Sequence, residues 1–464
     1  MKKDHSPAWP ARCITLALLG ATAQASPLLV QSDTWFKTST ADSASLPAAS
    51  KCLVTAGTRL EANGATSPAS NHYQVTLSAA PAGCAFSSGY FYSAHVSWHN
   101  WLTGPLAVDT PVPKSELSAF NAGYGGYPIW KSNNPEKYSG TGWLMQNGRA
   151  DAARGGSATP ISGCTNAYTF HINNTGRTAY VHLMASNPNG SALTLNAKGS
   201  MYSNTEKPLT GKAAGQSYFV AKDWLNGTFR TNISNRSVNA YTATEIAKVT
   251  ANVNNMIDGR FEVCTDRSVY LYTVVTYSGT TTDAINATQG AAAPGEIYSP
   301  GPGKFGREAG IYAASVVGGT SEVILPASGK YLGLAFNTTA KGAGLQEQTQ
   351  PATMRLADSS ERTYGNYGHK YDVTVRMRNN DSYAKTVRLS FASSFTGSTD
   401  TPSFTFNSPA KLNGTAIDLW TTPTKPRQTL GTWTIGANSY FDARLTTFIA
   451  GLGVTDQQLV VEVL

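Results

Sequence analysis

Hydrophobic and polar residues alternate with a period of two along much of this chain, most clearly between residues 364 and 391. Residues 371–376 alternate apolar and polar side chains, a polar turn follows at 379–382, and residues 387–391 resume the alternation. Such alternation places the apolar side chains on one face of a half-buried strand. The segment therefore predicts an antiparallel hairpin, the building unit of a β-sandwich.

The same pattern recurs at residues 179–195, so the chain contains two segments of this type. Each is followed by a glycine-polar-serine sequence that we interpret as a strand start, at 215–217 and at 436–439. Long alternating strands come later, at 268–277 and 458–464. Two related sandwich lobes would produce this similarity. Unrelated β-domains would produce it as well, and both interpretations remain open.

Two short segments depart from the period of two. Ile246, Val249 and Val253 fall on one helical face within residues 240–255, which predicts a helix there. A short helical turn is expected at 223–225. Taken with the alternating segments, these patterns predict an all-β protein with sandwich-type lobes and at most one or two short helices.

Composition agrees with an extracellular all-β protein that has many loops. The 464 residues include 43 glycines and only 14% charged residues. The formal net charge of +8 would suit contact with an acidic polysaccharide or an anionic envelope surface. The charges are scattered without a basic stripe, so they are also explained as a solubilising surface, and we expect no nucleic-acid partner.

Residues 1–25 are typical of a secretory signal peptide. Basic residues Lys2, Lys3 and Arg12 precede a short apolar run, and Ala23-Gln24-Ala25 provides a cleavage site of small residues. The apolar run is shorter than the roughly 20 residues needed to span a bilayer, which argues against a membrane anchor. The sequence predicts export to the periplasm, the cell surface or the extracellular space, with no transmembrane segment.

Four cysteines follow the signal segment, and an even number in an exported protein favours disulfides. Their positions along the chain favour the pairs Cys52–Cys84 and Cys164–Cys264, one in each of two modules. The alternative is a metal site with four thiolates. It would call for a C-x-x-C spacing that this sequence lacks.

Clusters of glycine and proline indicate where the domains divide. A small module occupies residues 30–97, and the stretch 98–126 is interpreted as a linker. A second loop or linker at 281–306 separates a first β lobe, residues 127–280, from a second β lobe, residues 307–464.

The module at 30–97 carries landmarks in the order seen in bacterial SH3-like domains, at residues 33–46, 56–58, 71–77 and 90–96. It resembles these domains, which accompany cell-wall peptidases and amidases. The resemblance implies a small SH3-like barrel that serves as an accessory binding module, often for cell-wall peptides, and has no catalytic role.

A second set of landmarks runs through residues 127–464. These are YPIWKSNNPE at 127–136, GTGWLM at 140–145, SNPNG at 186–190, AGQS at 214–217 and GNYG at 365–368. In this order they resemble a secreted bacterial family of unknown function, best represented in cyanobacteria, although Ala214 stands where the family pattern prefers proline. The resemblance implies a mostly β extracellular protein and brings no established activity.

The sequence has no local signature of a catalytic or metal site. His95 and His99 have a metal-compatible spacing only on a helix, and their neighbours favour the end of a strand. No G-x-S-x-G sequence or phosphate-binding loop occurs, and the carboxylates are scattered. We therefore predict no catalytic residue, no metal and no cofactor. Calcium at the loops 133–136 and 379–381 stays open, because turn chemistry explains their Asn and Asp residues equally well.

Aromatic residues are the candidate binding groups. Tyr73, Tyr90 and Tyr92 belong to two strands of the small module and could line a shallow groove. A module of this size also needs aromatic rings for its core, so that interpretation stays open. Trp98 and Trp101 belong to a tryptophan cluster that would form either a sugar platform or a domain interface.

The turn made of Gly365, Asn366, Tyr367 and Gly368 precedes a clean strand. Glycines that flank an asparagine suit backbone positions with positive φ, so we predict a structural and not a catalytic role for this motif.

Together these patterns predict an exported, non-catalytic binding or structural protein of the envelope or extracellular space. Its expected partner is a cell-wall peptide or polysaccharide bound by the small barrel, and its oligomeric state is left open. The alternative is an envelope-acting hydrolase with dispersed site residues, which a cleft with converging carboxylates, or with serine and histidine, would favour.

Overall fold

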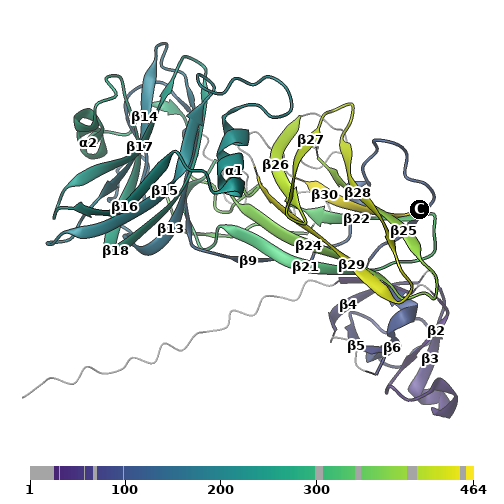
Figure 1. Cartoon of the computed structure of the whole chain (residues 1–464). Coiled ribbons are helices and arrows are strands. Elements are labelled where there is room, and N and C mark those ends of the chain that lie inside the picture. Colours follow the sequence, from purple (N-terminus) through teal and green to yellow (C-terminus); the bar gives the residue numbers. More distant parts are fainter. Residues whose placement is uncertain are drawn as a thin grey trace, which may run out of the picture. The chain divides into compact units, whose positions relative to one another are not determined.

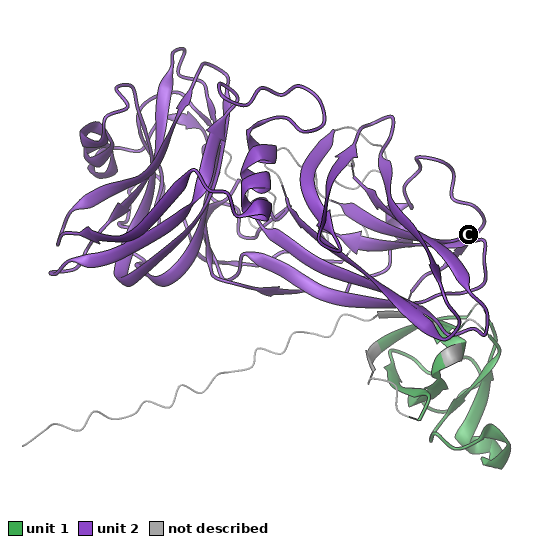
Figure 2. Ribbon diagram, viewed as in Figure 1, with its two compact units in different colours: residues 1–98 green, residues 99–464 purple. Residues whose placement is uncertain are grey.

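The computed structural model describes residues 26–464 except 31, 57, 66–69, 98, 298–306, 340–345, 394–404 and 450–455. The predicted signal peptide, Trp98 and residues 298–306 of the predicted loop or linker therefore lie outside the described residues. The described part contains strands β1 to β30 and only two α-helices, so the all-β prediction is confirmed. The chain divides into two compact units, residues 1–98 and 99–464 (Figure 2). Each unit is described by itself below.

Unit 1 is built on one seven-stranded antiparallel sheet in the order β3-β2-β6-β5-β4-β1-β7. The strands are β1 (Ser26–Val30), β2 (Thr34–Lys37), β3 (Lys51–Val54), β4 (Arg59–Ala65), β5 (His72–Leu77), β6 (Ser88–Tyr92) and β7 (Val96–Ser97). Phe36 stacks on Phe86 and Phe91 in the core, at ring-centroid distances of 5.1 and 4.6 Å. Among the described residues the outermost strands, β3 and β7, do not pair with each other. The sheet is therefore open, and the predicted barrel is not closed.

The first lobe of unit 2 is a β-sandwich whose two sheets share the long strand β18 (Met256–Thr276). The first part of β18 pairs with β13 (Ile161–Asn173) and β15 (Leu193–Ser203), and its last part pairs with β12 (Gly142–Gln146) and β14 (Ala179–Ser186). The other strands of lobe 1 are β10 (Ile129–Ser132), β11 (Lys137–Tyr138), β16 (Thr231–Val238), β17 (Ala243–Ala251), β19 (Gly295–Glu296), β20 (Ala309–Tyr312) and β23 (Ala352–Arg355). Its core includes Trp130, Trp143, Leu183, Phe261 and Leu271.

The second lobe is a sandwich of a six-stranded sheet, β27-β26-β29-β24-β21-β9, and a five-stranded sheet, β28-β25-β30-β22-β8 (Figure 1). The strands are β8 (Leu102–Thr103), β9 (Gly123–Gly125), β21 (Val316–Ile324), β22 (Lys330–Phe336), β24 (Lys370–Asn379), β25 (Lys385–Ala392), β26 (Phe406–Leu412), β27 (Thr415–Thr421), β28 (Arg427–Ile435), β29 (Ser439–Phe448) and β30 (Gln457–Val463). Alternate residues of β24 and β25 meet in the core between the sheets, as the alternating pattern indicates.

The segment 371–391, predicted to be a hairpin, is not one. Its strands β24 and β25 lie in opposite sheets of lobe 2, because β24 pairs with β21 and β29 whereas β25 pairs with β28 and β30. The chain leaves the six-stranded sheet at Asn379 and crosses to the five-stranded sheet. The Asn379 side-chain Nδ2 donates to the backbone oxygens of Tyr383, Ile435 and Gly436 at 2.7, 3.1 and 2.9 Å. A period of two indicates a strand but does not identify its partner, so the prediction of pairing was wrong.

The segment 179–195 makes the same crossing between sheets. Asn187 Nδ2 donates to the backbone oxygens of Ser191, Val238 and Asn239 at 2.9, 2.9 and 3.0 Å. The sheet order β16-β15-β18-β13 in lobe 1 matches β28-β25-β30-β22 in lobe 2, and the pair β14–β17 matches β24–β29. The matched strands also follow one another in the same order along the chain, which supports the hypothesis of an internal duplication.

The helix predicted at 240–255 is wrong, because residues Ala243–Ala251 form strand β17. In its pairing with β14, Leu183 lies opposite Ala247 and Met184 lies opposite Glu245, so Ile246 is an extra, bulged residue. The bulge places the buried residues Ile246 and Val249 three positions apart. This spacing imitates that of a helix.

The short helical turn expected at 223–225 is part of a longer helix, which also occupies the position where a strand start was expected. Helix α1 (Gln216–Asn226) begins after Gly215. This residue has a φ of +84°, which glycine adopts without strain. Ser217, Val220 and Ala221 are buried at helical spacing. The helix lies between the two lobes of unit 2 and packs against β15 and β26 (Figure 1).

Two predicted connecting segments also carry structure. Within the predicted linker 98–126, β8 pairs with β22 and β9 pairs with β21, and Trp101 and Phe120 are buried in the core of lobe 2. Within 281–306, Thr281–Gln289 form helix α2. Strands β20 and β23, from the predicted second lobe, complete a sheet of lobe 1. Glycine and proline indicate irregular backbone but do not show whether that backbone is packed.

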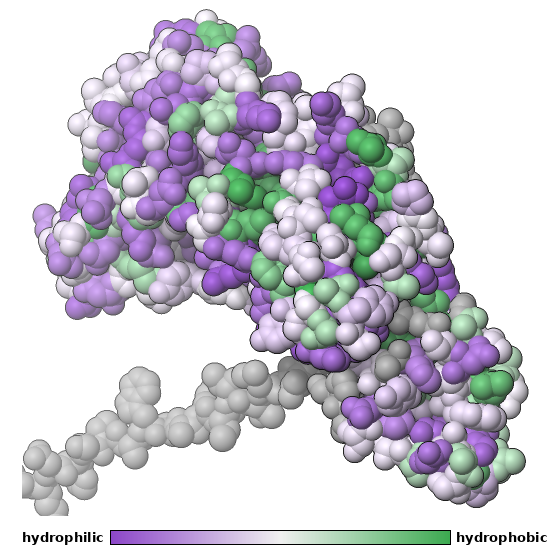
Figure 3. All heavy atoms as spheres, turned by 45° about the vertical axis from the view of Figure 1, so that its right-hand side comes forward, coloured by the Kyte–Doolittle hydropathy of each residue, from purple (hydrophilic) through white to green (hydrophobic). Residues whose placement is uncertain are grey.

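Hydrophobic residues form small patches among polar ones on the face shown in Figure 3. Within the described part of the chain, no helix has both the length and the apolar character needed to cross a membrane.

Candidate functional site

Unit 1 contains a hollow of about 420 Å³. It lies beside β2, the turn that follows β2, the start of β5 and the end of β6. These segments are far apart in sequence, and the sheet order β2-β6-β5 brings them together. The hollow is therefore a product of the fold and not of a local motif.

Two aromatic side chains line this hollow and remain accessible. Trp35 is 37% exposed and Tyr92 is 38% exposed. Trp35 alternates along β2 with Thr34 and Phe36, which are buried, so Trp35 points away from the core. Such rings offer flat apolar surfaces for a peptide side chain or a sugar ring.

The base of the hollow holds a contact between Lys37 and His72. Lys37 Nζ donates to Ala41 O at 2.6 Å and lies 2.9 Å from His72 Nε2. His72 Nδ1 lies 2.7 Å from Ser70 O, which can only accept, so Nδ1 carries a proton and Nε2 accepts from the lysine. Burial lowers the pKa of Lys37, and the nearby Asp42 carboxylate partly offsets this effect.

A second imidazole and two carboxylates complete the lining. The His95 ring lies edge-on to Tyr92 at 4.9 Å, and its Nδ1 is 3.1 Å from Thr34 Oγ1. Asp33 accepts from the Ala56 N–H and Asp42 accepts from the Ala44 N–H, both at 2.8 Å. The hollow therefore presents both signs of charge beside aromatic faces. This combination suits a ligand that carries an amino group and a carboxylate on a compact body.

The five predicted binding residues do not come together. Tyr92 lines the hollow. Tyr90 lies two residues before it on the same strand but does not line the hollow. Tyr73 lies opposite Phe91 in the β5–β6 pair and packs against the core. Trp98 is outside the described residues, and Trp101 is buried in the core of unit 2.

Sequence reasoning missed Trp35, Lys37, His72 and His95 as lining residues. One signal was available, since Trp35 occupies a position between two core residues of an alternating strand. The histidines could not be found in this way, because their contribution depends on which strands become neighbours.

The structure pairs the cysteines as expected from the sequence. Cys52 is bonded to Cys84 in unit 1, and Cys164 is bonded to Cys264 in lobe 1. Cys164 and Cys264 are directly opposite on the neighbouring strands β13 and β18, with their Cα atoms 4.0 Å apart. The second disulfide therefore fastens two central strands of one sheet.

The contacts of the turn at 365–368 support a structural role. The Asn366 side chain is buried, accepts from Thr363 Oγ1 at 2.8 Å and donates to Gln348 O at 2.7 Å. Gly368 has a φ of +77°, and a Cβ there would lie 2.5 Å from atoms of the Tyr168 ring. Glycine at 368 thus permits close packing of the turn against lobe 1.

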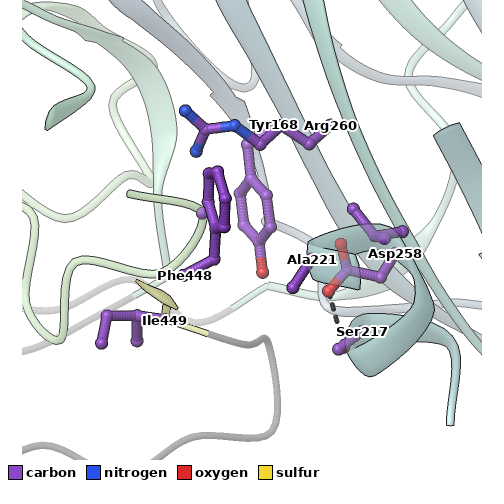
Figure 4. A pocket seen from close by; sticks show the side chains of 9 residues that line it. Tyr168, Ser217, Ala221, Asp258, Arg260, Phe448 and Ile449 are labelled. Carbon is purple, nitrogen blue, oxygen red and sulfur yellow. Dashed lines mark hydrogen bonds between the residues drawn. The ribbon is translucent and has the colours of Figure 1, made fainter. Parts of the chain in front are cut away.

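A cluster of buried polar groups lies between the lobes of unit 2 (Figure 4). Ser217 Oγ donates to Asp258 Oδ2 at 2.6 Å, and the Arg260 guanidinium lies over the Phe448 ring at 4.6 Å. The cavity among these groups has a volume of about 10 Å³, which is room for no more than about one water molecule. We interpret the cluster as lobe packing and not as a ligand site.

Among the described residues, no group of three or more His, Cys, Asp or Glu side chains is arranged to hold a metal ion.

Residues 285–414 match a family model described as "Protein of unknown function (DUF3370)". None of the curated proteins matches the chain. Among solved structures, the N-terminal CBM22-1-CBM22-2 tandem domain of Paenibacillus barcinonensis Xyn10C is 9% identical, covers 70% of this chain and 91% of its own, and has a TM-score of 0.15. Lac15 from a marine microbial metagenome is 12% identical, covers 94% of this chain and 85% of its own, and has a TM-score of 0.11. Scores this low assign neither fold nor function. The comparisons therefore establish similarity to an uncharacterised family over residues 285–414.

Proposed function

We propose that this is an exported, non-catalytic binding protein of the cell envelope or extracellular space, and that the hollow of unit 1 receives a peptide or glycan of the cell wall. The observation that carries the proposal is the placement of Trp35 and Tyr92 beside Lys37 and Asp42 around one hollow. Two disulfides support export, because such bonds persist in oxidising compartments.

The charges in the hollow favour a peptide over a neutral glycan. Lys37 and the His95 imidazole would face a carboxylate, and Asp33 and Asp42 would face an amino group. The flat faces of Trp35 and Tyr92 would hold the aliphatic part of the same peptide. The resemblance of residues 30–97 to SH3-like domains that accompany wall peptidases points in the same direction.

A pelleting experiment tests the proposal. The chain from residue 26 onward is mixed with intact cell walls, and the bound fraction is measured with and without soluble wall peptides or polysaccharides as competitors. We expect Trp35→Ala and Tyr92→Ala to reduce the bound fraction, and soluble wall peptide to compete. Tyr440→Ala is the control, since this tyrosine is 51% exposed but belongs to unit 2. Equal binding by all three variants would exclude the hollow as the site.

The same experiment identifies an envelope-acting hydrolase. Mass spectrometry of the supernatant would then detect wall fragments whose amount grows with time. A binding protein leaves the fragment pattern unchanged.

A further inference from the structure

A second hollow, in lobe 1, is lined by three tyrosines. It has a volume of about 530 Å³ and lies among the Asn187–Pro188 turn, the turn before β17, the last part of β18 and helix α2. Tyr241, Tyr270 and Tyr272 line it. Tyr241 is 77% exposed, which leaves its ring free to meet a ligand.

The backbone at Tyr241 is unusual for this residue type. Its φ is +56°, in the left-handed region that asparagine and glycine adopt readily and that a large aromatic residue rarely adopts. Backbone strain of this kind collects at functional positions. A tyrosine in this conformation is therefore a reason to look for a role of its side chain.

The second lobe supplies a comparison within the same chain. Asn187 donates to the oxygens of Val238 and Asn239, and Asn379 donates to those of Ile435 and Gly436. Aligned on these contacts, Tyr241 corresponds to Asn438, which has a φ of +49°. Lobe 2 thus has the residue that suits this backbone, and lobe 1 has an exposed tyrosine in its place.

Two glycines allow tyrosine side chains of the lining to pack closely against the backbone. A Cβ at Gly190 would lie 3.2 Å from the Tyr241 hydroxyl oxygen, so the Tyr241 side chain extends over Gly190. A side chain at Gly148 would collide with the Tyr272 hydroxyl group. The glycine at 148 therefore lets the Tyr272 hydroxyl group pack against the backbone of the lining.

The polar lining determines which ligand fits. Arg149 is the one charged side chain among the described residues of the lining. Its guanidinium is held at the end of α2, where it donates to Gln289 O at 2.9 Å and to Gly290 O. Ser186, Thr242 and Thr288 add hydroxyl groups.

We propose that this hollow binds a sugar unit of a glycan, with preference for a sugar that carries a carboxylate. Tyrosine faces stack on the C–H face of a pyranose ring, and hydroxyl groups pair with sugar hydroxyls. Arg149, with no carboxylate beside it in the lining, attracts an acidic sugar and gives no support to a cationic ligand. This site is separate from the hollow of unit 1 and takes a different class of ligand.

Titration calorimetry on the chain from residue 26 onward tests the proposal, with an oligogalacturonate as the acidic probe and a gluco-oligosaccharide of equal length as the neutral probe. We expect saturable binding that is stronger for the acidic probe. Tyr241→Asn, which installs the residue of the second lobe, should weaken binding about tenfold through lost stacking. The same change should leave the melting temperature equal or higher, because asparagine tolerates the backbone.

Three further variants separate the possible causes. Tyr241→Phe keeps the ring and should keep the affinity. Tyr383→Asn removes a tyrosine of lobe 2 that is 54% exposed, and it should leave the affinity for both probes unchanged. Trp35→Ala should also leave the affinity for both probes unchanged, which keeps this test independent of the unit 1 hollow. Absence of binding by both probes at about 10 mM, or unchanged affinity in Tyr241→Asn, would overturn the proposal. Equal affinity for both probes would overturn the preference for an acidic sugar.

Discussion

Asn187 and Asn379 close the sheet-to-sheet crossings of the two lobes through the same contacts. Each side-chain nitrogen donates to the backbone oxygen four residues later and to two consecutive oxygens at the end of a distant strand. Each side-chain oxygen accepts a backbone N–H two residues later, from Asn189 at 2.8 Å and from Asp381 at 3.1 Å. Asn173 repeats the arrangement between β13 and β14. The buried amide replaces ladder hydrogen bonds that the chain loses when it leaves a sheet.

Replacing Asn379 by alanine should destabilise lobe 2 strongly. Three backbone oxygens would lose the hydrogen bond from the fully buried Asn379 amide, and of these Gly436 O still accepts from Ser439 Oγ at 3.1 Å; the free energy of unfolding should fall by about 3 kcal/mol. Urea denaturation measures the change. The neighbouring Asn380 is exposed, so Asn380→Ala should cost less than about 0.5 kcal/mol. Similar losses in both variants would contradict the assigned role of the Asn379 amide.

Two glycines with nearly equal φ should respond differently to alanine. Gly368 has a φ of +77° and meets the Tyr168 ring, whereas Gly329 has a φ of +78° and nothing within 4 Å of its Cβ position. Gly329→Ala should cost about 1 kcal/mol, from backbone strain alone. Gly368→Ala should cost at least about 3 kcal/mol, because the buried ring cannot move aside. Thermal denaturation of the two variants gives the difference, and equal losses would show that the ring contact is unimportant.

The disulfide between Cys164 and Cys264 should contribute most of the covalent stabilisation. It spans a sequence separation of 100, against 32 for Cys52 and Cys84. In the chain-entropy model the longer loop contributes about 4.7 kcal/mol to stability and the shorter one about 3.7 kcal/mol. Paired Cys→Ser variants in denaturant measure both, and a larger loss for the Cys52–Cys84 variant would contradict the loop-length argument.

Stability of unit 2 should fall as the pH drops below neutrality, in part through His171. Burial lowers the pKa of this histidine to about 3. Its Nδ1 donates to Pro135 O at 2.7 Å, and Ser132 Oγ lies 2.8 Å from Nε2. The unfolded chain, with a pKa of about 6.5, therefore binds a proton that the folded chain does not bind. Between pH 7 and pH 5 this one residue should lower the free energy of unfolding by about 2 kcal/mol.

A variant separates His171 from the other titrating groups. His171→Asn should be less stable than the unaltered chain at pH 7, but its stability should fall less steeply toward pH 5. Urea denaturation at pH 7, 6 and 5 provides the slopes. Burial also lowers the pKa of His369, so part of the pH dependence should remain in the variant. The assignment fails if both proteins have the same slope.

The fold class could be predicted because a period of two is a local property of the sequence. The partners of each strand could not be predicted. The segments around Val375 and Val387 have the same alternating pattern whether their strands are neighbours in one sheet or lie in two sheets that pack across a core. The bulge at Ile246 changed the local period and made a strand resemble a helix. Only the short turn at 223–225 was predicted of helix α1, although Ser217, Val220 and Ala221 have helical spacing, because the glycine before them was interpreted as a strand start.

The candidate site was predictable only in part, for a similar reason. Tyr92 could be selected as an aromatic residue on a short strand. Lys37 and His72 become neighbours only when β2, β6 and β5 assemble. The sequence around either residue does not indicate that the two side chains are in contact. Tyr241 gave no sequence signal, because a positive φ at a tyrosine is visible only in the folded backbone.

The pairing of β9 with β21 has a consequence for the biogenesis of unit 2. Residues Gly123–Gly125 precede the whole of lobe 1 in the chain, yet they complete a sheet with Val316–Ile324, which are synthesised after every described strand of lobe 1 except Ala352–Arg355. Lobe 1 likewise depends on Ala309–Tyr312 and Ala352–Arg355 for the edge of its sheet. Lobe 2 cannot acquire all its strands until lobe 1 has been translated, and lobe 1 cannot acquire β23 until β8, β9, β21 and β22 of lobe 2 have been translated. The two lobes must therefore complete their folding together. A gene divided at residues 281–306 would encode two halves that each lack strands of their sheets.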